Sequence, residues 1–390
     1  HHGAAGTSAE NGDGIFNSAA DIAAGITEVR KETGADGSFT LTDLGASDYT
    51  FAIETTGATV DMVTGLAYGS GVVLKAPEGA SMVTPATTMV NAVMIADGVT
   101  AAEAMADVAV ALGFDATLDI NNFDAYKVPT TGTALEIAAA KTLQFNMQVS
   151  NNQVMSVVKS FAKAGEAAGV SGADAYNVAL KAVVDVVRDK VTALDGGAAA
   201  GGATTLLNFS TDMTTIFNDF VAKIAAEATY DATKAAAFTA VVADAKAGID
   251  VAIVQLKALV EPVTAADVLA NKQVLEAVSV ISTQIAEAAK VIMDGGTIAE
   301  AAAKILISDT ASFLAVKNNP APEGMTLSGS TMVGGVETVT IAENATSLVV
   351  GTVAGTDGFT QAGVAVSAVV AADETFTYAI VGGPTVPVFT

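Results

Sequence analysis

Hydrophobic and polar residues follow two different periods along this chain. In residues 1–83, short runs such as 38–42, 49–53 and 71–74 alternate every second residue, and turns rich in Gly, Ala and Asp separate them. A period of two places successive side chains on opposite faces of a strand. The pattern therefore predicts a small antiparallel β domain over residues 1–83.

The apolar period changes to 3.6 over residues 84–317, where alanine becomes abundant. In the helix expected after Thr264, for example, the predicted buried stripe runs from Val268 through Val274 and Ile281 to Ile292. Alanine at helix crossings lets two backbones come close, which favours a tightly packed bundle. The pattern predicts helices over 134–165, 172–195, 210–228, 231–260, 265–294 and 297–316.

Several helix starts carry Ser or Thr followed three residues later by an acid, which is the pattern of a capping box. In this motif the hydroxyl accepts a backbone N–H of the first turn, and the acid accepts the backbone N–H of the hydroxyl residue. The pairs are Thr100 with Glu103, Thr133 with Glu136, Ser171 with Asp174, Thr264 with Asp267 and Thr297 with Glu300.

A linker rich in Asn and Pro occupies residues 318–324 and ends the helical region. Short runs with strand periodicity then return over 325–390 and predict a small β-sandwich. The predicted fold class is therefore a multidomain α+β protein. It has a small N-terminal β domain, a large Ala-rich helical bundle and a small C-terminal β-sandwich.

Composition and charge exclude several classes of protein. Lys and Arg number 18 against 42 Asp and Glu, which gives a net charge of −24 and excludes a nucleic-acid partner. The chain has no Cys, and its only His residues are His1 and His2, a tag remnant or the true start. Catalytic triads and His-ligated metal sites are excluded, so we expect no enzyme. No apolar run reaches the length of a membrane span.

Two segments resemble parts of large secreted bacterial surface proteins. Residues 34–44, Gly-Ala-Asp-Gly-Ser-Phe-Thr-Leu-Thr-Asp-Leu, and the following Tyr-Thr-Phe of 49–51 resemble a hairpin of carboxypeptidase-regulatory-like β domains. Residues 83–90, Val-Thr-Pro-Ala-Thr-Thr-Met-Val, are similar to the "VTPLTTLV" junction that leads from such domains into Ala-rich helices. The resemblance covers residues 10–165 and implies a secreted surface or adhesin-type protein.

The C-terminal region resembles the cadherin-like repeats of bacterial adhesins. The matching pieces are 339–345, 349–353 and 375–382. In that family, the Glu of an x-E-N motif and a D-x-D motif bind Ca²⁺ between repeats. The resemblance implies a Ca²⁺ ligand at Glu343 and, because only one acid of the second motif is kept, a weak one at Asp357.

Residues 9–20 carry part of the spacing of an EF-hand calcium loop. Ala stands at the first and last ligand positions, and an acid adjoins the last one. Two interpretations stay open, a Ca²⁺ loop and an Asx-rich turn without metal. The candidate Ca²⁺ ligands are Asn11, Asp13, Ile15 through its carbonyl, Asn17 and Asp21.

The N-terminal domain predicted here starts at the Asp/Gly loop, without the strand that opens carboxypeptidase-regulatory-like domains. The predicted sheet then has an unpaired edge. The apolar C-terminal tail, with Val386, Val388 and Phe389, is the hypothesised donor strand that completes the sheet of the next copy. Such a head-to-tail contact builds a filament or a lattice. The alternative is a chain cut from a larger protein.

An amide run marks the helix predicted over 134–165. Two interpretations stay open, a polar face with a local kink and a hydrogen-bonded seam between subunits. The run consists of Gln144, Asn146, Gln148, Asn151, Asn152 and Gln153.

The predicted function is a non-catalytic structural subunit of a bacterial cell surface. It is extracellular, assembles with copies of itself into a filament, sheath or S-layer-like array, and uses Ca²⁺. The alternative is a ligand-binding adhesin segment of a larger surface protein, although the absence of Trp removes the usual platform for sugars. A hydrolase with a carboxylate pair comes third, because no acid pair is singled out.

Overall fold

The computed structural model describes two compact units that divide at Thr310. In the first unit it describes residues 31–34, 37–41, 50–56, 59, 71–127, 130–193, 207–262 and 265–310. In the second it describes residues 311–318 and five strands. The strands are β3 (Met325–Val333), β4 (Val336–Glu343), β5 (Leu348–Val350), β6 (Val366–Ala368) and β7 (Thr375–Val381).

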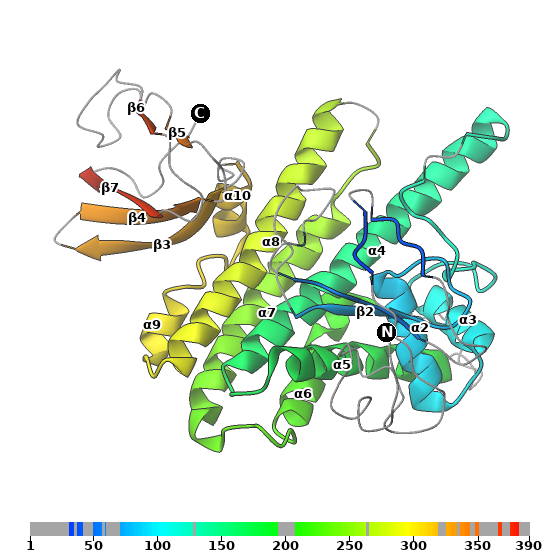
Figure 1. Cartoon of the computed structure of the whole chain (residues 1–390), viewed down its shortest axis with the longest axis horizontal. Coiled ribbons are helices and arrows are strands. Elements are labelled where there is room, and N and C mark those ends of the chain that lie inside the picture. The colour runs from blue at the N-terminus through cyan, green and yellow to red at the C-terminus, as the bar shows by residue number, and fades with distance from the viewer. Residues whose placement is uncertain are drawn as a thin grey trace. The chain divides into compact units, whose positions relative to one another are not determined.

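The first unit consists of a helical bundle preceded by a two-stranded sheet (Figure 1). Strands β1 (Phe51–Glu54) and β2 (Val73–Ala76) are antiparallel, with Ile53 opposite Leu74. None of the described helices is long and apolar enough to cross a membrane. The helices are α2 (Pro85–Asp97), α3 (Ala101–Ala111), α4 (Ala134–Glu166), α5 (Gly172–Ala193), α6 (Phe209–Ile224), α7 (Ala235–Lys257), α8 (Ala265–Met293) and α9 (Ile298–Ala302), with a 3-10 turn η2 (Ala232–Lys234) before α7.

Helix α4 lies at the centre of the bundle and packs against α5, α7 and α8. Near its C-terminal end, the ring of Phe161 stacks on Phe220 of α6 with centroids 5.1 Å apart. Gly165 brings backbones together there, because a Cβ atom at this position would lie only 3.0 Å from the Cβ of Ala175. The close packing expected of an Ala-rich bundle is therefore present where α4, α5 and α6 meet.

Most of the predicted helices are confirmed, with boundaries that shift by a few residues. The predicted helix over 297–316 is wrong, because α9 ends at Ala302 and α10 begins only at Thr310 (Thr310–Asn318). Between them the chain buries Ile305 and Ile307, and the N–H of Ile307 donates to Gln284 Oε1 at 3.1 Å. Burial of these two side chains, together with a buried amide acceptor, stabilises the break.

The capping boxes are confirmed at Thr100, Thr133 and Thr297. At Ser171 the hydroxyl accepts the N–H of Asp174 at 3.2 Å, which is the side-chain half of the motif. Thr264 lies outside the described residues. A further box at Thr84, closed by Thr87 instead of an acid, was not predicted.

The N-terminal β prediction is confirmed in part. β1 and β2 overlap the predicted runs at 49–53 and 71–74, whereas the described residues of the run at 38–42 are not in a strand. In the second unit, β3, β4 and β7 form one sheet in that order and β5 pairs with β6. A β-sandwich built from these two sheets stays a prediction.

We predict that Gly248→Ala destabilises the protein. Replacing an open helical Gly with Ala stabilises by about 0.5–1 kcal/mol, but a Cβ at this position of α7 would lie 2.9 Å from the carbonyl oxygen of Ile307. Relieving such a contact costs about 1–3 kcal/mol, so urea denaturation should show a net loss. Ala243→Gly, at an exposed position of the same helix, measures what a Cβ contributes without the contact. A Gly248→Ala variant more stable than the parent would contradict the close approach.

A second prediction concerns acid. The backbone N–H of Thr100, and then its hydroxyl, hold the pKa of Glu103 below its ordinary value of 4.5. Because the folded-state pKa is lowered, the stabilisation is complete above the ordinary pKa and is lost as the pH falls through the lowered one. The stability difference between the parent and Glu103→Gln, from urea denaturation, should therefore be largest near neutral pH and shrink below pH 4.5.

The matched control is Glu227→Gln, since the Glu227 side chain makes no hydrogen bond to any residue described here. Its effect should not show this acid loss. A Glu103→Gln effect that is the same from pH 7 to pH 3 would exclude the carboxylate as the source.

Candidate functional site

The amides of α4 bind a loop of the same chain. Nε2 of Gln144 donates to the carbonyl of Asp124 at 3.0 Å and also to that of Lys127, and Nε2 of Gln148 donates to the carbonyl of Ala125 at 2.6 Å. We call residues 115–127 the docked loop. Because the donors are side chains and the acceptors are backbone carbonyls, the contact depends on the path of the loop more than on its side chains.

A third amide of α4 holds the start of α2. Asn151 is buried, and its Oδ1 accepts the backbone N–H of Ala86 at 3.0 Å. The first N–H groups of a helix lack partners within the helix, so Asn151 satisfies one that would otherwise be buried without an acceptor. We call Gln144, Gln148 and Asn151 the amide strip. These three amides, predicted as a polar face or a seam between subunits, make these bonds within one chain.

Helix α2 in turn covers the outer edge of β2. The hydroxyls of Thr87 and Thr88 both donate to the carbonyl of Lys75 at 3.1 Å, and the N–H of Lys75 donates to Thr88 Oγ1 at 2.8 Å. Two threonines on a helix thus satisfy the backbone groups that a neighbouring strand would satisfy. Strand addition at Lys75 would have to displace them.

Charged side chains join α2, α5 and α6. Arg188 of α5 binds both carboxylate oxygens of Asp97 at the end of α2, and it also pairs with Asp185 at 3.0 Å. Lys223 of α6 lies 2.7 Å from Asp185 and 3.5 Å from Asp219. The hydrogen bond from Arg188 lowers the pKa of Asp97, whereas burial raises the pKa of Asp219. Each of these acids has a cationic neighbour, so the cluster acts as a clamp between helices.

The predicted calcium ligands are placed only in part. Asn11, Asp13, Ile15, Asn17, Asp21 and Asp357 lie outside the described residues, as do Val386, Val388 and Phe389 of the hypothesised donor tail. Glu343 is the last residue of β4 and is paired with Met325 across the sheet. Within the described ranges, no group of three or more acids or histidines is arranged to hold a metal ion. Calcium binding stays a prediction.

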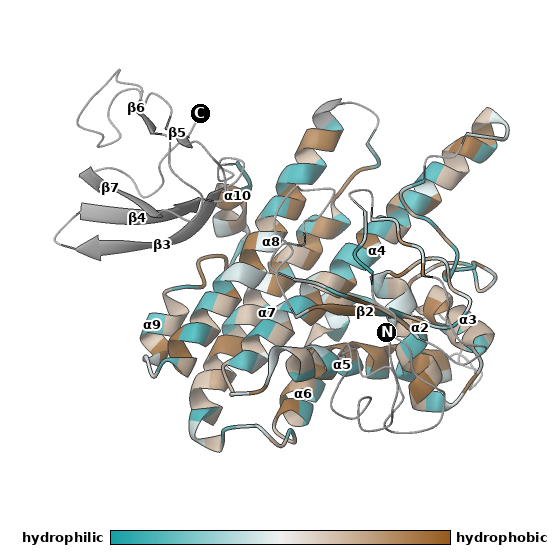
Figure 2. Cartoon of the chain, in the orientation of Figure 1, coloured by the Kyte–Doolittle hydropathy of each residue, from teal (hydrophilic) through white to brown (hydrophobic). Residues whose placement is uncertain are grey.

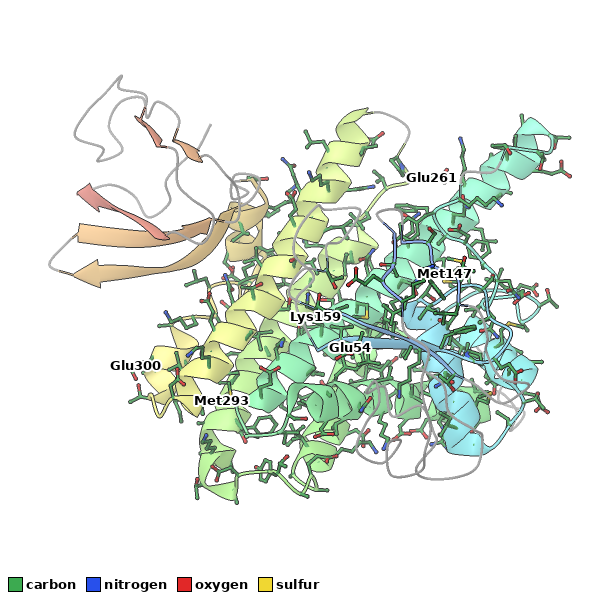
Figure 3. All side chains as sticks on the ribbon, viewed as in Figure 1. Glu54, Met147, Lys159, Glu261, Met293 and Glu300 are labelled. Carbon is green, nitrogen blue, oxygen red and sulfur yellow. The ribbon has the colours of Figure 1, made fainter. Side chains whose placement is uncertain are left out.

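Large apolar side chains are exposed at both ends of α8. Near the start of α8, a hydrogen bond from Asn271 Nδ2 to the carbonyl of Val260, 2.7 Å long, holds the α7–α8 connection and its exposed Val260 against the helix. Hydrophobic residues lie along the ends of α4 and α8 in Figure 2, and Figure 3 places Glu261 at one end of α8 and Met293 at the other. The corner patch consists of Val254, Val260, Val268 and Leu269, and the turn patch of Met293, Ile298 and Leu306.

No protein family, curated protein or solved structure matches this chain. The resemblance to secreted bacterial surface proteins therefore stays a prediction.

Periodicity alone did not identify the corner patch. Val268 was expected in the buried stripe of α8, but it is 56% exposed, while Val274, Ile281 and Ile292 of that stripe are buried. The sequence offers no signal for this exposure, because neighbouring apolar residues such as Val268 and Leu269 also occur together within a core-facing stripe.

We predict that Asn151→Leu destabilises the protein by about 1–3 kcal/mol, because it leaves the buried N–H of Ala86 without an acceptor. The neighbouring Asn152 is a matched control, since its Nδ2 donates to the Gln148 carbonyl of its own helix at 2.9 Å. Asn152→Leu should cost less, as measured by urea denaturation. Equal losses in the two variants would show that the Ala86 bond contributes nothing specific.

Proposed function

We propose that this chain is a non-catalytic, extracellular building block of a bacterial cell surface that assembles with copies of itself. The observation that carries the proposal is the exposure of large apolar side chains at both ends of α8. Where exposed apolar side chains of this size adjoin one another, they mark interaction sites on proteins. Support also comes from the resemblance of 34–51 and 83–90 to secreted surface proteins and from the lack of Cys and of any His beyond His2.

The two patches differ in composition and lie far apart. A helix rises about 1.5 Å per residue, so Val268 and Met293 are about 37 Å apart along α8. A contact between the corner patch of one copy and the turn patch of the next joins two different surfaces. Such a heterologous contact leaves a free patch at each end, so it continues into a filament or a lattice.

The net charge of −24 opposes this assembly, because the copies repel one another. Salt screens surface charges only beyond about 8 Å at physiological ionic strength, and contacts are closer than that. A bound divalent cation lowers the net negative charge of each copy. Calcium at Asn11, Asp13, Ile15, Asn17 and Asp21, and more weakly at Glu343 and Asp357, is therefore proposed to promote assembly.

The test uses two variants of the full chain. Leu269→Lys disables the corner patch and Ile298→Lys disables the turn patch. We expect the parent to form filaments or sheets with Ca²⁺ by electron microscopy and size-exclusion chromatography, and each variant alone to form neither. An equal mixture should stop at a small oligomer, because each pair contains only one good corner patch and one good turn patch.

The matched control is Ile95→Lys, since Ile95 is 57% exposed on α2 but belongs to neither patch. It should assemble like the parent. A parent chain that stays monomeric with and without Ca²⁺ but binds cells or glycans would contradict the proposal and favour an adhesin segment.

A further inference from the structure

The docked loop is held on α4 by polar contacts that lie near the surface. Gln144 and Gln148 are half-buried, and the loop residues Tyr126 and Lys127 are exposed. The donors on α4 match three closely spaced carbonyls, those of Asp124, Ala125 and Lys127. The spacing of the donors on α4 therefore fits the backbone of this loop, and every copy of the chain carries the same loop.

The described residues directly before α4, from Thr130 to Thr133, are exposed. Ala134 begins α4 about 15 Å before Gln144 along the helix axis, and the chain must cover this distance from Lys127. Residues 130–136 are all exposed, and Leu135 is 80% exposed. Figure 1 shows this end of α4 projecting past the neighbouring helices. We call residues 130–142 the arm.

The arm contains a natural hinge. Gly132 has φ +119°, a backbone conformation that other residues rarely adopt. The capping box at Thr133 fixes the start of α4 directly after it. A change of dihedral angles at a few exposed residues, from Thr130 to Gly132, therefore redirects everything N-terminal to α4 without disturbing the helix.

We propose that the docked loop is exchangeable, so that the loop of one copy occupies the amide strip of a second copy and carries the preceding part of the chain, including β2, α2 and α3, with it. In the closed form, each loop occupies the amide strip of its own chain. The exchanged pair regains the same bonds of Gln144, Gln148 and Asn151, so the two forms differ mainly in hinge conformation, and a high protein concentration favours the exchanged pair. This inference deepens the proposed function and rests on it, because exchange gives self-assembly a second link between copies.

The absence of Cys from the chain allows a clean cross-linking test. Full-length Tyr126→Cys and Lys141→Cys variants, the second at an exposed position three residues before Gln144, are mixed, refolded together at high and at low concentration, and treated with a short bismaleimide. We expect a covalent dimer in the mixture, above the level in either variant alone, and its loss after refolding at low concentration. Deleting Thr130 and Thr131 shortens the hinge, so the dimer should replace the monomer as the main species.

Two controls decide the outcome. One chain carrying both Tyr126→Cys and Lys141→Cys should cross-link internally, which shows that the two sites are within reach. A mixture of Tyr126→Cys with Ala243→Cys, an exposed position on α7, measures random collisions. If the internal link forms but the mixed dimer never exceeds this background, exchange is excluded. Filaments that still form in that case would leave the proposed function standing.

Discussion

The first unit depends on one constraint on α4. This helix has to pack against apolar side chains at one end and bind backbone groups by hydrogen bonds in its middle. Toward its C-terminal end it packs apolar rings and a glycine against α5 and α6, where Phe161 stacks on Phe220. Toward its middle it presents Gln144, Gln148 and Asn151 to backbone groups of the docked loop and of α2. Shape specifies the first set of contacts, and hydrogen-bond geometry specifies the second, because an unpaired buried amide is costly. One 33-residue helix thus contacts α2, α5, α6, α7 and α8.

The helical part could be predicted from sequence because its signals are local. A Thr and an acid three residues apart determine a helix start without help from the rest of the chain, as at Thr133 and Glu136. Apolar residues with a period of 3.6 then extend the helix. The break after Ala302 could not be found in this way. It depends on Gln284, which accepts the N–H groups of Leu306 and Ile307, 22 and 23 residues further along the chain.

The candidate site was predictable only as a list of polar residues. The amide run could be recognised in the sequence. Whether its side chains contact water, another subunit or the same chain depends on the path of residues 115–127, and these residues have no periodicity from which that path could be predicted. The prediction that Val268 is buried was wrong for a related reason. Val268 continues the apolar stripe of α8, yet the bundle does not extend far enough to cover it. A pattern shows which side chains avoid water, and only the tertiary structure shows whether a neighbour is available.

The threonine contacts between α2 and β2 join residues that are synthesised close together in time. Lys75 and Thr88 are only 13 residues apart, so a strand edge that could pair with a neighbouring nascent chain is covered as soon as the next helix turn emerges. The cover needs no partner strand from later in the sequence and closes a short loop, which is fast. Contacts between residues close in the sequence thus cover this strand edge at Lys75 before the later helices have been made.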